Sequence, residues 1–404
     1  MKILLLGDAS NYHHALAAGL RQLGCDVTVA SAGSGFMNTG RDIDIRRRFG
    51  GRLGGLDLWL KILGPLRSRL KGYDVVQLVS PCFLELKPKR LHKVFDFLKR
   101  HNGKVFATYL GTDIPFIDEC LDLASPLRYN EYRIGNEKGP LLVEQPDIVE
   151  RWNNPALKQW TDYFYRNIDG AVTALYEYAV AARRVLPPER CAYAGIPVET
   201  AELQPVDIPD DPAPVRFFLG RHRHRMAEKG TDRFEAALRA AAAQRPGKAE
   251  IIIVENRPYA EYLQLLKSAH VVVDQAYSYT PGVNALLAMS YGIPVVSGGE
   301  EDYYRFIGET EDHPGAAEEH SGAAAIYRAT TSLESSAQKP LRPIYNSPVD
   351  TEGMTRLFLH IIDHPEELKP RGEASRAFAV RHNDARVVAA RFLDFWHKMG
   401  VSAE

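Results

Sequence analysis

Short apolar runs alternate with stretches of helical periodicity along this chain, and the alternation occurs twice. Short runs rich in β-branched residues predict strands, whereas apolar residues at every third or fourth position predict helices. In the first half the predicted strands are residues 3–6, 26–30, 74–79, 104–109 and 170–174, with helices over 11–23, 89–99 and 176–185. Strands separated by helices of this length favour a parallel sheet with right-handed crossovers.

The second half repeats the pattern. The predicted strands are residues 215–219, 250–254, 271–274 and 293–296, with helices over 232–243, 259–268, 281–291 and 384–399. The sequence therefore predicts an α/β protein with two Rossmann-like, doubly wound parallel-sheet domains that face each other across a cleft. Ligands of such domains bind at the carboxyl ends of the strands.

Residues 204–214 (QPVDIPDDPAP) separate the two halves. Four prolines and three aspartates in this segment exclude a helix interior or a central strand. We expect an N-terminal domain over 1–203, a linker over 204–214 and a C-terminal domain over 215–383. The helix within 384–404 is expected to pack back toward the N-terminal domain. The alternative is one large domain with a long surface loop at 204–214.

Composition narrows the class of protein. Hydrophobic residues make up 45% of the chain and charged residues 25%, with a formal charge of −1, which are ordinary values for a globular protein. The four cysteines form no C-x-x-C pair, so a disulfide framework or a zinc site is not indicated. The apolar run at the N-terminus is too short for a signal peptide. We expect a cytoplasmic protein.

A basic loop follows the strand at 215–219. Arg221, Arg223, Arg225 and Lys229 place four cations within nine residues, ahead of a predicted helix N-terminus. Such a cluster suits a diphosphate, because arginine forks bind phosphate oxygens and helix N-termini favour anions. The alternatives are a solvated basic loop and a metal site at His222 and His224. The sequence supplies no third metal ligand, so we predict phosphate binding with no metal and no cofactor.

A second candidate site precedes the helix predicted at 281–291. Thr280 is a plausible N-cap, Pro281 fits the first helical position, and Gly282 would let a ligand approach the backbone. Tyr279 and Asn284 are the neighbouring side chains that could contact a donor. Many capped helices of this kind bind nothing, so cap chemistry alone does not establish a site.

These motifs, in this order, make the chain similar to the retaining glycosyltransferases of family 4, which have the GT-B fold. In the second half the motifs are, in order, F-L-G-R, a basic loop, K-G-x-D and A-M-S-Y-G-I-P-V-V-S-G-G. In the first half, residues 20–29 resemble the family's opening motif, L-x-x-x-G-H-E-V-x-V. Residues 106–113 resemble the family's H-G-[ST]-D turn, and 194–198 lie where the family leaves its first domain. The resemblance covers residues 2–396. It implies that 1–203 form the acceptor-side domain and 215–383 the nucleotide-sugar-binding domain.

The resemblance implies roles for particular residues. The arginine and lysine that clasp the donor diphosphate match Arg221 and Lys229, although Arg223 or Arg225 could take the arginine's place because the spacing is longer here. The family's two glutamates, with seven residues between them, fall on Tyr279 and Leu287. The histidine of the first-domain turn falls on Leu110. Both glutamates and the histidine are thus replaced.

Because that histidine is replaced, other polar residues of the first domain are candidates to line the cleft. Gly111 and Asp113 remain from the family's turn. Asp8, Asn11 and His13 follow the first strand and could reach the cleft instead. Each of these side chains could equally be a cap, a turn residue or a surface residue.

Residues 41–71 carry nine cations against three acids, interleaved with leucines, Phe49 and Trp59. A basic amphipathic helix with tryptophan is typical of a peripheral membrane contact, or of a site for a polyprenyl-linked acceptor. We therefore consider a location at the inner face of the membrane. The alternative is a helix whose apolar face packs on the first sheet. Nucleic acid is not indicated, because no stacking platform or binding motif is present.

The resemblance implies a glycosyltransferase that moves a sugar from a nucleoside diphosphate to a glycan or lipid-linked acceptor, with retention and without a metal. The replaced glutamates leave open a non-catalytic relative that binds a nucleotide or glycan as a partner subunit. A nicotinamide-dependent oxidoreductase is excluded, because neither half has G-x-G-x-x-G after its first strand.

Overall fold

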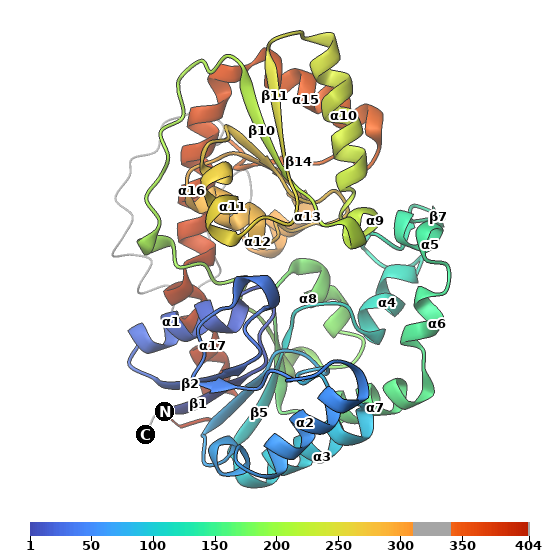
Figure 1. Ribbon diagram of the computed structural model, residues 1–404, viewed down its shortest axis with the longest axis vertical. Helices are drawn as coiled ribbons and strands as arrows, with labels where there is room; N and C mark the ends of the chain where they lie inside the picture. Colours follow the sequence, from blue (N-terminus) through green and yellow to red (C-terminus); the bar gives the residue numbers. More distant parts are fainter. Residues whose placement is uncertain (310–340, 403–404) are drawn as a thin grey trace. The chain divides into compact units, whose positions relative to one another are not determined.

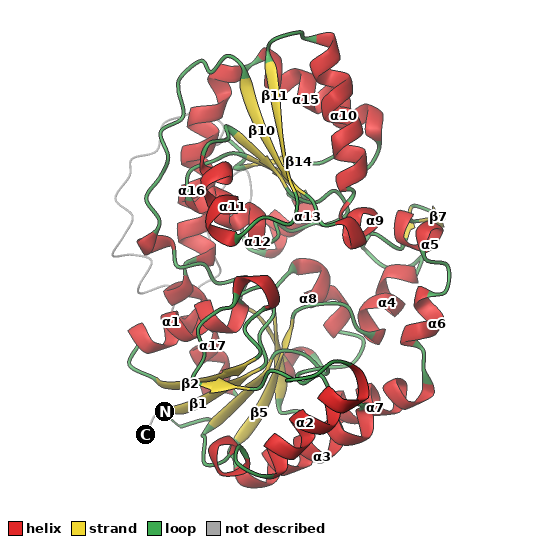
Figure 2. Ribbon diagram, viewed as in Figure 1, coloured by secondary structure: helices red, strands yellow, loops and turns green. Residues whose placement is uncertain are grey.

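A computed structural model of the chain describes residues 1–309 and 341–402, and the fold divides into two compact units. The first unit contains Met1–Glu119, Asp147–Glu199 and Ala385–Glu404, and the second contains Cys120–Pro146 and Thr200–Asp384. Each unit has its own parallel sheet with helices packed on it (Figure 1, Figure 2). The predicted fold class, with two doubly wound α/β domains, is confirmed.

The sheet of the first unit has seven parallel strands. In spatial order they are β3 (Ile43–Asp44), β2 (Asp26–Ser31), β1 (Lys2–Leu6), β4 (Val75–Leu78), β5 (Lys104–Tyr109), β8 (Gly170–Thr173) and β9 (Cys191–Tyr193). Residues Ile3–Leu6 are completely buried, as expected for a central strand covered on both faces.

Helices cover both faces of this sheet. They are α1 (Tyr12–Gln22), α2 (Gly51–Leu63), α3 (Pro88–His101), α4 (Ile114–Leu121), α6 (Ile148–Trp152), α7 (Pro155–Asn167), α8 (Tyr176–Ala182) and α17 (Ala385–Lys398). Helices α1 and α17 lie together on one side, and α2, α3 and α7 lie on the other (Figure 1). The chain adds strands on one side of β1 and then on the other, each time through a right-handed crossover, and this places helices on both faces of the sheet.

The sheet of the second unit has five parallel strands. In spatial order they are β11 (Ala249–Val254), β10 (Val215–Gly220), β12 (Val271–Val273), β13 (Val295–Ser297) and β14 (Ile344–Asn346). Its helices are α9 (Met226–Lys229), α10 (Thr231–Gln244), α11 (Tyr259–Lys267), α12 (Val283–Ser290), α13 (Glu301–Phe306), α15 (Thr351–Asp363) and α16 (Leu368–Asn383). Phe217, Phe234 and Phe358 are fully buried in its core.

The segment Cys120–Pro146 belongs to the second unit, and not to the N-terminal domain that the sequence indicated. It contains a short antiparallel hairpin of β6 (Arg133–Ile134) and β7 (Glu137–Lys138), followed by α5 (Pro140–Glu144). Arg133 holds the segment together, since its guanidinium donates to the carbonyl oxygens of Cys120, Asp122, Leu127 and Gly135.

The proline-rich segment Gln204–Pro214 lies wholly within the described residues and contains no helix or strand. It belongs to the second unit, where Ile208 is buried. The sequence also predicts a loop over residues 309–324, because this stretch is rich in glycine, alanine and glutamate, and apart from Glu309 it lies outside the described residues. Among the described helices, none is both long and apolar enough to cross a membrane.

The contact between α1 and α17 depends on Gly19. A β-carbon at Gly19 would lie 2.0 Å from the carbonyl oxygen of Ala385 and 3.0 Å from the Ala389 side chain. The two helices can approach this closely only because the residue is glycine. Further along α17, Trp396 is fully buried and donates to Gln77 of β4.

We therefore expect Gly19→Ala to destabilise the first unit by about 1–3 kcal/mol, the range for overpacking a well-packed core. The matched control is Gly55→Ala in α2, where the nearest atoms to the new β-carbon lie 3.9 Å away at the ends of arginine side chains. Gly55→Ala should leave stability unchanged or raise it slightly, because alanine favours the helix. Thermal unfolding of both variants checks this, and equal melting temperatures would contradict it.

Candidate functional site

The candidate site of the second unit lies where β10 and β12 end side by side. The two strands are paired in parallel, with Leu219 opposite Val273, so Arg221 and Asp274 leave the same edge of the sheet. Lys229, at the end of α9, reaches back to this edge and contacts Asp274 at 3.0 Å between Nζ and Oδ1. The carboxyl ends of parallel strands are where such sheets bind ligands.

All four predicted cations have carboxylate partners. Arg221 lies between Glu235 at 2.5 Å and Glu255 at 2.9 Å. Glu255 also pairs with Arg223, and Arg225 pairs with Glu228. Desolvation opposes the charged form of Glu255, but Arg221 and Arg223 together hold its pKa below the usual range. The loop is therefore a network of compensated charges and not a bare cationic patch.

The four cations differ in exposure. The side chains of Arg221 and Lys229 are each 24% exposed, whereas Arg223 is 74% and Arg225 50% exposed. Arg221 and Lys229 therefore lie at the strand ends with fixed neighbours, and Arg223 and Arg225 extend toward solvent. The two residues that the family resemblance selects are the inner pair.

Asp274 is the most buried member of this cluster, with its side chain 1% exposed. One carboxylate oxygen accepts from Lys229, and the other, Oδ2, makes no hydrogen bond to any residue in the described ranges. A β-carbon at Gly282 would lie 2.6 Å from Oδ2. Gly282 is thus required for the close approach between Asp274 and the start of α12. Sequence reasoning placed Asp274 at a strand end without giving it a role.

The helix start predicted at Thr280 and Pro281 is wrong. Helix α12 begins at Val283 with Gly282 as its N-cap. The reason is a local turn around Ser278, whose hydroxyl donates to the Thr280 carbonyl at 2.6 Å while the Thr280 amide bonds to the same hydroxyl at 3.2 Å. The N-cap residue is a glycine and no described side chain caps α12, so side chains leave its first amides unbonded. Asn284 is half-buried in the first turn.

Tyr279, at the position of the family's first glutamate, is covered by the segment Cys120–Pro146. Its ring stacks on Tyr129, with ring centroids 4.8 Å apart, and its hydroxyl accepts from the backbone amides of Arg128 and Tyr129. Burial raises the pKa of Tyr279 to about 12. Tyr279 is thus engaged with the protein itself.

Glu300 and Asp302 hold the same segment in place. The Arg128 guanidinium bonds to both carboxylates, and the Tyr129 hydroxyl donates to Glu300 at 2.8 Å. Asn346 also donates to Glu300 at 2.9 Å. Sequence reasoning missed this cluster entirely. The signal that could have found it is the acidic run directly after the glycines that follow β13.

In the first unit, His13 is a core residue and not the lining of an open site. It is fully buried, and its Nδ1 donates to the Gly7 carbonyl at 2.7 Å, so Nε2 accepts from the Thr108 hydroxyl at 3.1 Å. Burial lowers the pKa of His13. Asp8 accepts from the His13 amide and from the Thr39 hydroxyl.

Asn11 is also part of the local structure. It adopts a left-handed conformation with φ of 67° at the start of α1, and its amide donates to the Ser34 hydroxyl. Asp8, Asn11 and His13 therefore position the turn after β1.

Asp113 and Gly111 line a small cavity at the carboxyl ends of β4 and β5. The cavity has a volume of about 160 Å³. Its lining comprises Ser80–Cys82, Thr108–Asp113 and Tyr165. Asp113 is buried and accepts from the hydroxyls of Tyr109, at 2.7 Å, and Tyr165, and from the Phe116 amide. Burial, opposed by these bonds, raises the pKa of Asp113 to about 6.

Solved structures similar to this chain include glycosyltransferases. HepE of Anabaena, in complex with UDP and glucose, aligns with a TM-score of 0.53 at 13% identity, covering 98% of this chain and 99% of HepE. Sucrose-phosphate synthase of Thermosynechococcus elongatus aligns with a TM-score of 0.58 at 12% identity, covering 99% of each chain.

The lipopolysaccharide galactosyltransferase WaaB gives a TM-score of 0.51 at 12% identity, covering 98% of this chain and 99% of WaaB. No family profile and no curated protein matches the sequence.

The raised pKa of Asp113 predicts a pH-dependent stability. The folded protein holds this proton more tightly than the unfolded chain, so the stabilisation is complete below about pH 3.8 and is lost as the pH rises through about 6. Between about pH 4 and 7 the wild type should lose up to about 3 kcal/mol more than Asp113→Asn, which cannot ionise.

Denaturant unfolding across this pH range measures the difference. The control is Asp162→Asn, which changes an exposed carboxylate in α7 of the same unit and should follow the wild type. Parallel curves for the wild type and Asp113→Asn would show that the carboxyl titrates normally.

The likeness to HepE, sucrose-phosphate synthase and WaaB extends over nearly the whole chain and agrees with its two parallel sheets, so this protein has the GT-B fold of these glycosyltransferases.

Proposed function

We propose that the protein transfers a sugar from a nucleoside diphosphate donor to a glycan or lipid-linked acceptor. The observation that carries this proposal is the placement of Arg221 and Lys229 at the ends of β10 and β12, beside the uncapped start of α12. Two partly buried cations and a row of free amides are what a diphosphate requires. HepE, which has the same fold, was crystallised with UDP and with UDP-glucose.

The carboxylate partners explain how the cations would work. Glu235, Glu255 and Asp274 hold the two side chains in position before a ligand arrives, so little reorganisation is needed when phosphate oxygens approach. Arg221 and Lys229 would then stabilise the charge that develops on the departing diphosphate. We propose that they fill the role that a metal ion has in other transferases, and that the acceptor attacks with retention of configuration.

We propose that the first unit binds the acceptor. The cavity beside Gly111 and Asp113 lies at the carboxyl ends of its strands, which suits a polar group of an acceptor or of the donor sugar. We propose a glycan or polyprenyl-linked acceptor, and a place of action in the cytoplasm at the inner face of the membrane.

One observation favours a second function, that of a non-catalytic GT-B relative which binds a nucleotide or glycan as a partner subunit. The residue at the first glutamate position, Tyr279, is stacked under Tyr129 and hydrogen-bonded to the Arg128–Tyr129 backbone. A side chain occupied in this way supplies no carboxylate to a donor sugar. Turnover, and not nucleotide binding, separates the two functions.

Arg221→Ala should reduce turnover by about 100-fold or more, the usual loss when one charge-stabilising group is removed. Lys229→Met is best combined with Asp274→Asn, because the single change would leave Asp274 buried without its cation. The matched control is Arg225→Ala, which removes a half-exposed arginine of the same loop and should keep most of the activity.

The measurements are turnover across UDP-, GDP- and dTDP-sugars and calorimetry with UDP and GDP. Nucleotide binding without turnover in the wild type would favour the partner-subunit function. An absence of both binding and turnover with every donor would overturn the transferase proposal.

A further inference from the structure

Helix α2 is apolar on two opposite faces. Gly54, Leu58 and Ile62 are buried in the first unit. Leu53, Leu56, Leu60 and Leu63 are exposed, and their spacing of three, four and three residues places them in one stripe. At 100° per residue this stripe lies roughly opposite the buried residues. A helix that is apolar all round is normally buried all round.

The exposed stripe is unusual for this molecule. Within residues 1–309 and 341–402, nine large hydrophobic side chains are exposed, and five of them are Phe49 and the four leucines of the stripe. Leu53 is 69% exposed and Leu60 58%. Scattered single leucines are ordinary on protein surfaces, but a contiguous group marks a surface that another partner covers.

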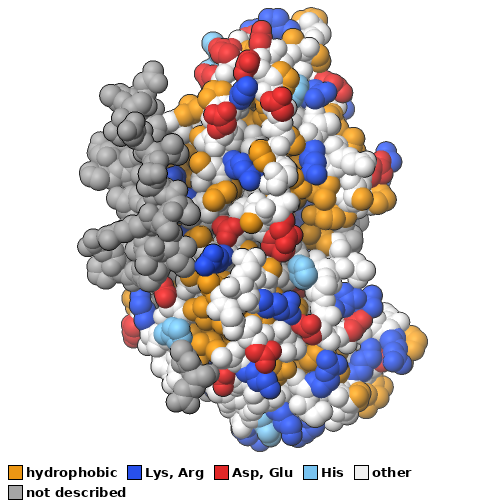
Figure 3. Space-filling view, turned by 90° about the vertical axis from the view of Figure 1, so that its left-hand side faces the viewer, with side chains coloured by type: hydrophobic (Ala, Val, Ile, Leu, Met, Phe, Trp, Pro, Cys, Tyr) orange, Lys and Arg blue, Asp and Glu red, His pale blue; other side chains and the backbone are white. Residues whose placement is uncertain are grey.

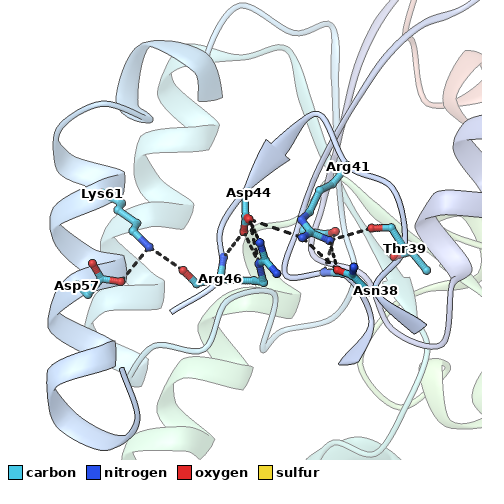
Figure 4. A network of polar contacts seen from close by, with 9 residues as sticks. Asn38, Thr39, Arg41, Asp44, Arg46, Asp57 and Lys61 are labelled. Carbon is cyan, nitrogen blue, oxygen red and sulfur yellow. Dashed lines mark hydrogen bonds and ion pairs between the residues drawn. The ribbon is translucent and has the colours of Figure 1, made fainter. Parts of the chain in front are cut away.

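Polar contacts fix which face of α2 points outward. Lys61 bonds to Asp57 at 2.9 Å and to the Arg46 carbonyl at 2.7 Å. The side chains of Asp57 and Lys61 therefore point toward the segment that precedes α2 (Figure 4). Asp57 also accepts from the Arg48 amide at 3.0 Å.

On the other flank, Arg90 of α3 lies over the Trp59 ring at 5.5 Å and donates to the Gly55 carbonyl at 2.7 Å. The helix is thus held on both flanks, and the leucine stripe cannot turn inward.

Exposed cations lie at both ends of the stripe. The six that are exposed are Arg46, Arg48 and Arg52 at its start and Arg67, Arg69 and Lys71 beyond its end. The nearby acids Asp44 and Asp57 are already engaged, with Arg46 and Lys61 respectively. Cationic and apolar side chains also lie next to each other along the lower right edge of the molecule in Figure 3.

We propose that α2 and its flanking cations form a docking surface for an anionic lipid bilayer, in which the leucine stripe enters the interface and the cations contact the head groups. Apolar stripes rimmed by arginine and lysine bind membranes in this way, through buried apolar area and attraction to anionic lipids. A second copy of the chain fits less well, because a two-fold interface would bring the same six cations together. This inference deepens the membrane location proposed above, and the surface shares no residue with the donor site.

Vesicle co-sedimentation of the full chain tests the proposal. The wild type should bind vesicles of equimolar phosphatidylcholine and phosphatidylglycerol and bind phosphatidylcholine alone much more weakly. Leu56→Asp/Leu60→Asp should weaken binding by at least about tenfold. Arg48→Gln/Arg52→Gln should weaken it by roughly fivefold per cation and reduce its sensitivity to salt. The control is Leu123→Asp, which changes a leucine that is 67% exposed on the other unit and should bind like the wild type.

Three outcomes would overturn the proposal: no binding to either vesicle, equal binding to both, or wild-type binding by Leu56→Asp/Leu60→Asp. Sedimentation velocity is run in parallel, and a wild-type dimer that becomes monomeric in this variant would identify a second copy as the partner instead. Thermal unfolding confirms that each variant is folded. Nucleotide calorimetry on the same variants should be unchanged, so a failure here is distinguishable from a failure of the transferase proposal.

Discussion

The contact between Lys229 and Asp274 is the interaction on which the site of the second unit depends. Asp274 is almost completely buried at the end of β12, and a buried carboxylate is costly unless a cation or hydrogen bonds compensate it. Lys229 supplies that cation from the end of α9, which follows the basic loop after β10. The pair therefore fixes the basic loop relative to the neighbouring strand, and Gly282 allows α12 to begin against the same carboxylate. The basic loop, the end of β12 and the start of α12 therefore meet at Asp274.

The elements of the fold could be predicted well from local pattern. Residues Ile3–Leu6 of β1 form a continuous buried run, and β5 was placed with its observed bounds, because central parallel strands leave an unbroken apolar signature. Short edge strands such as β3 and β14 were missed, since two or three residues carry too little periodicity to be recognised. The start of α12 was misplaced because Ser278, not Thr280, organises the turn before it.

Contacts between residues distant in the sequence could not be predicted. Nothing near Tyr279 in the sequence indicates that Tyr129 stacks on it. The carboxylates that pair with Arg128 lie more than 170 residues later in the sequence. Pairing within the basic loop was likewise hidden, because Glu235 and Glu255 are close to Arg221 only after β10, α10 and β11 have folded. For α2 the two interpretations from sequence were offered as alternatives, whereas one face packs inward and the opposite face remains exposed.

The assignment of Cys120–Pro146 to the second unit has a consequence for how the chain must assemble. The chain leaves the first unit at Cys120, returns to it at Asp147 and enters the second unit again at Thr200. It ends in the first unit with α17. The two units are therefore interleaved along the chain, and no single cut yields two complete pieces. During synthesis, Arg128 and Tyr129 emerge long before Tyr279, Glu300 and Asp302, so their ring and backbone groups must stay solvated until the later half is made. Neither half of the chain holds all the parts of its own unit.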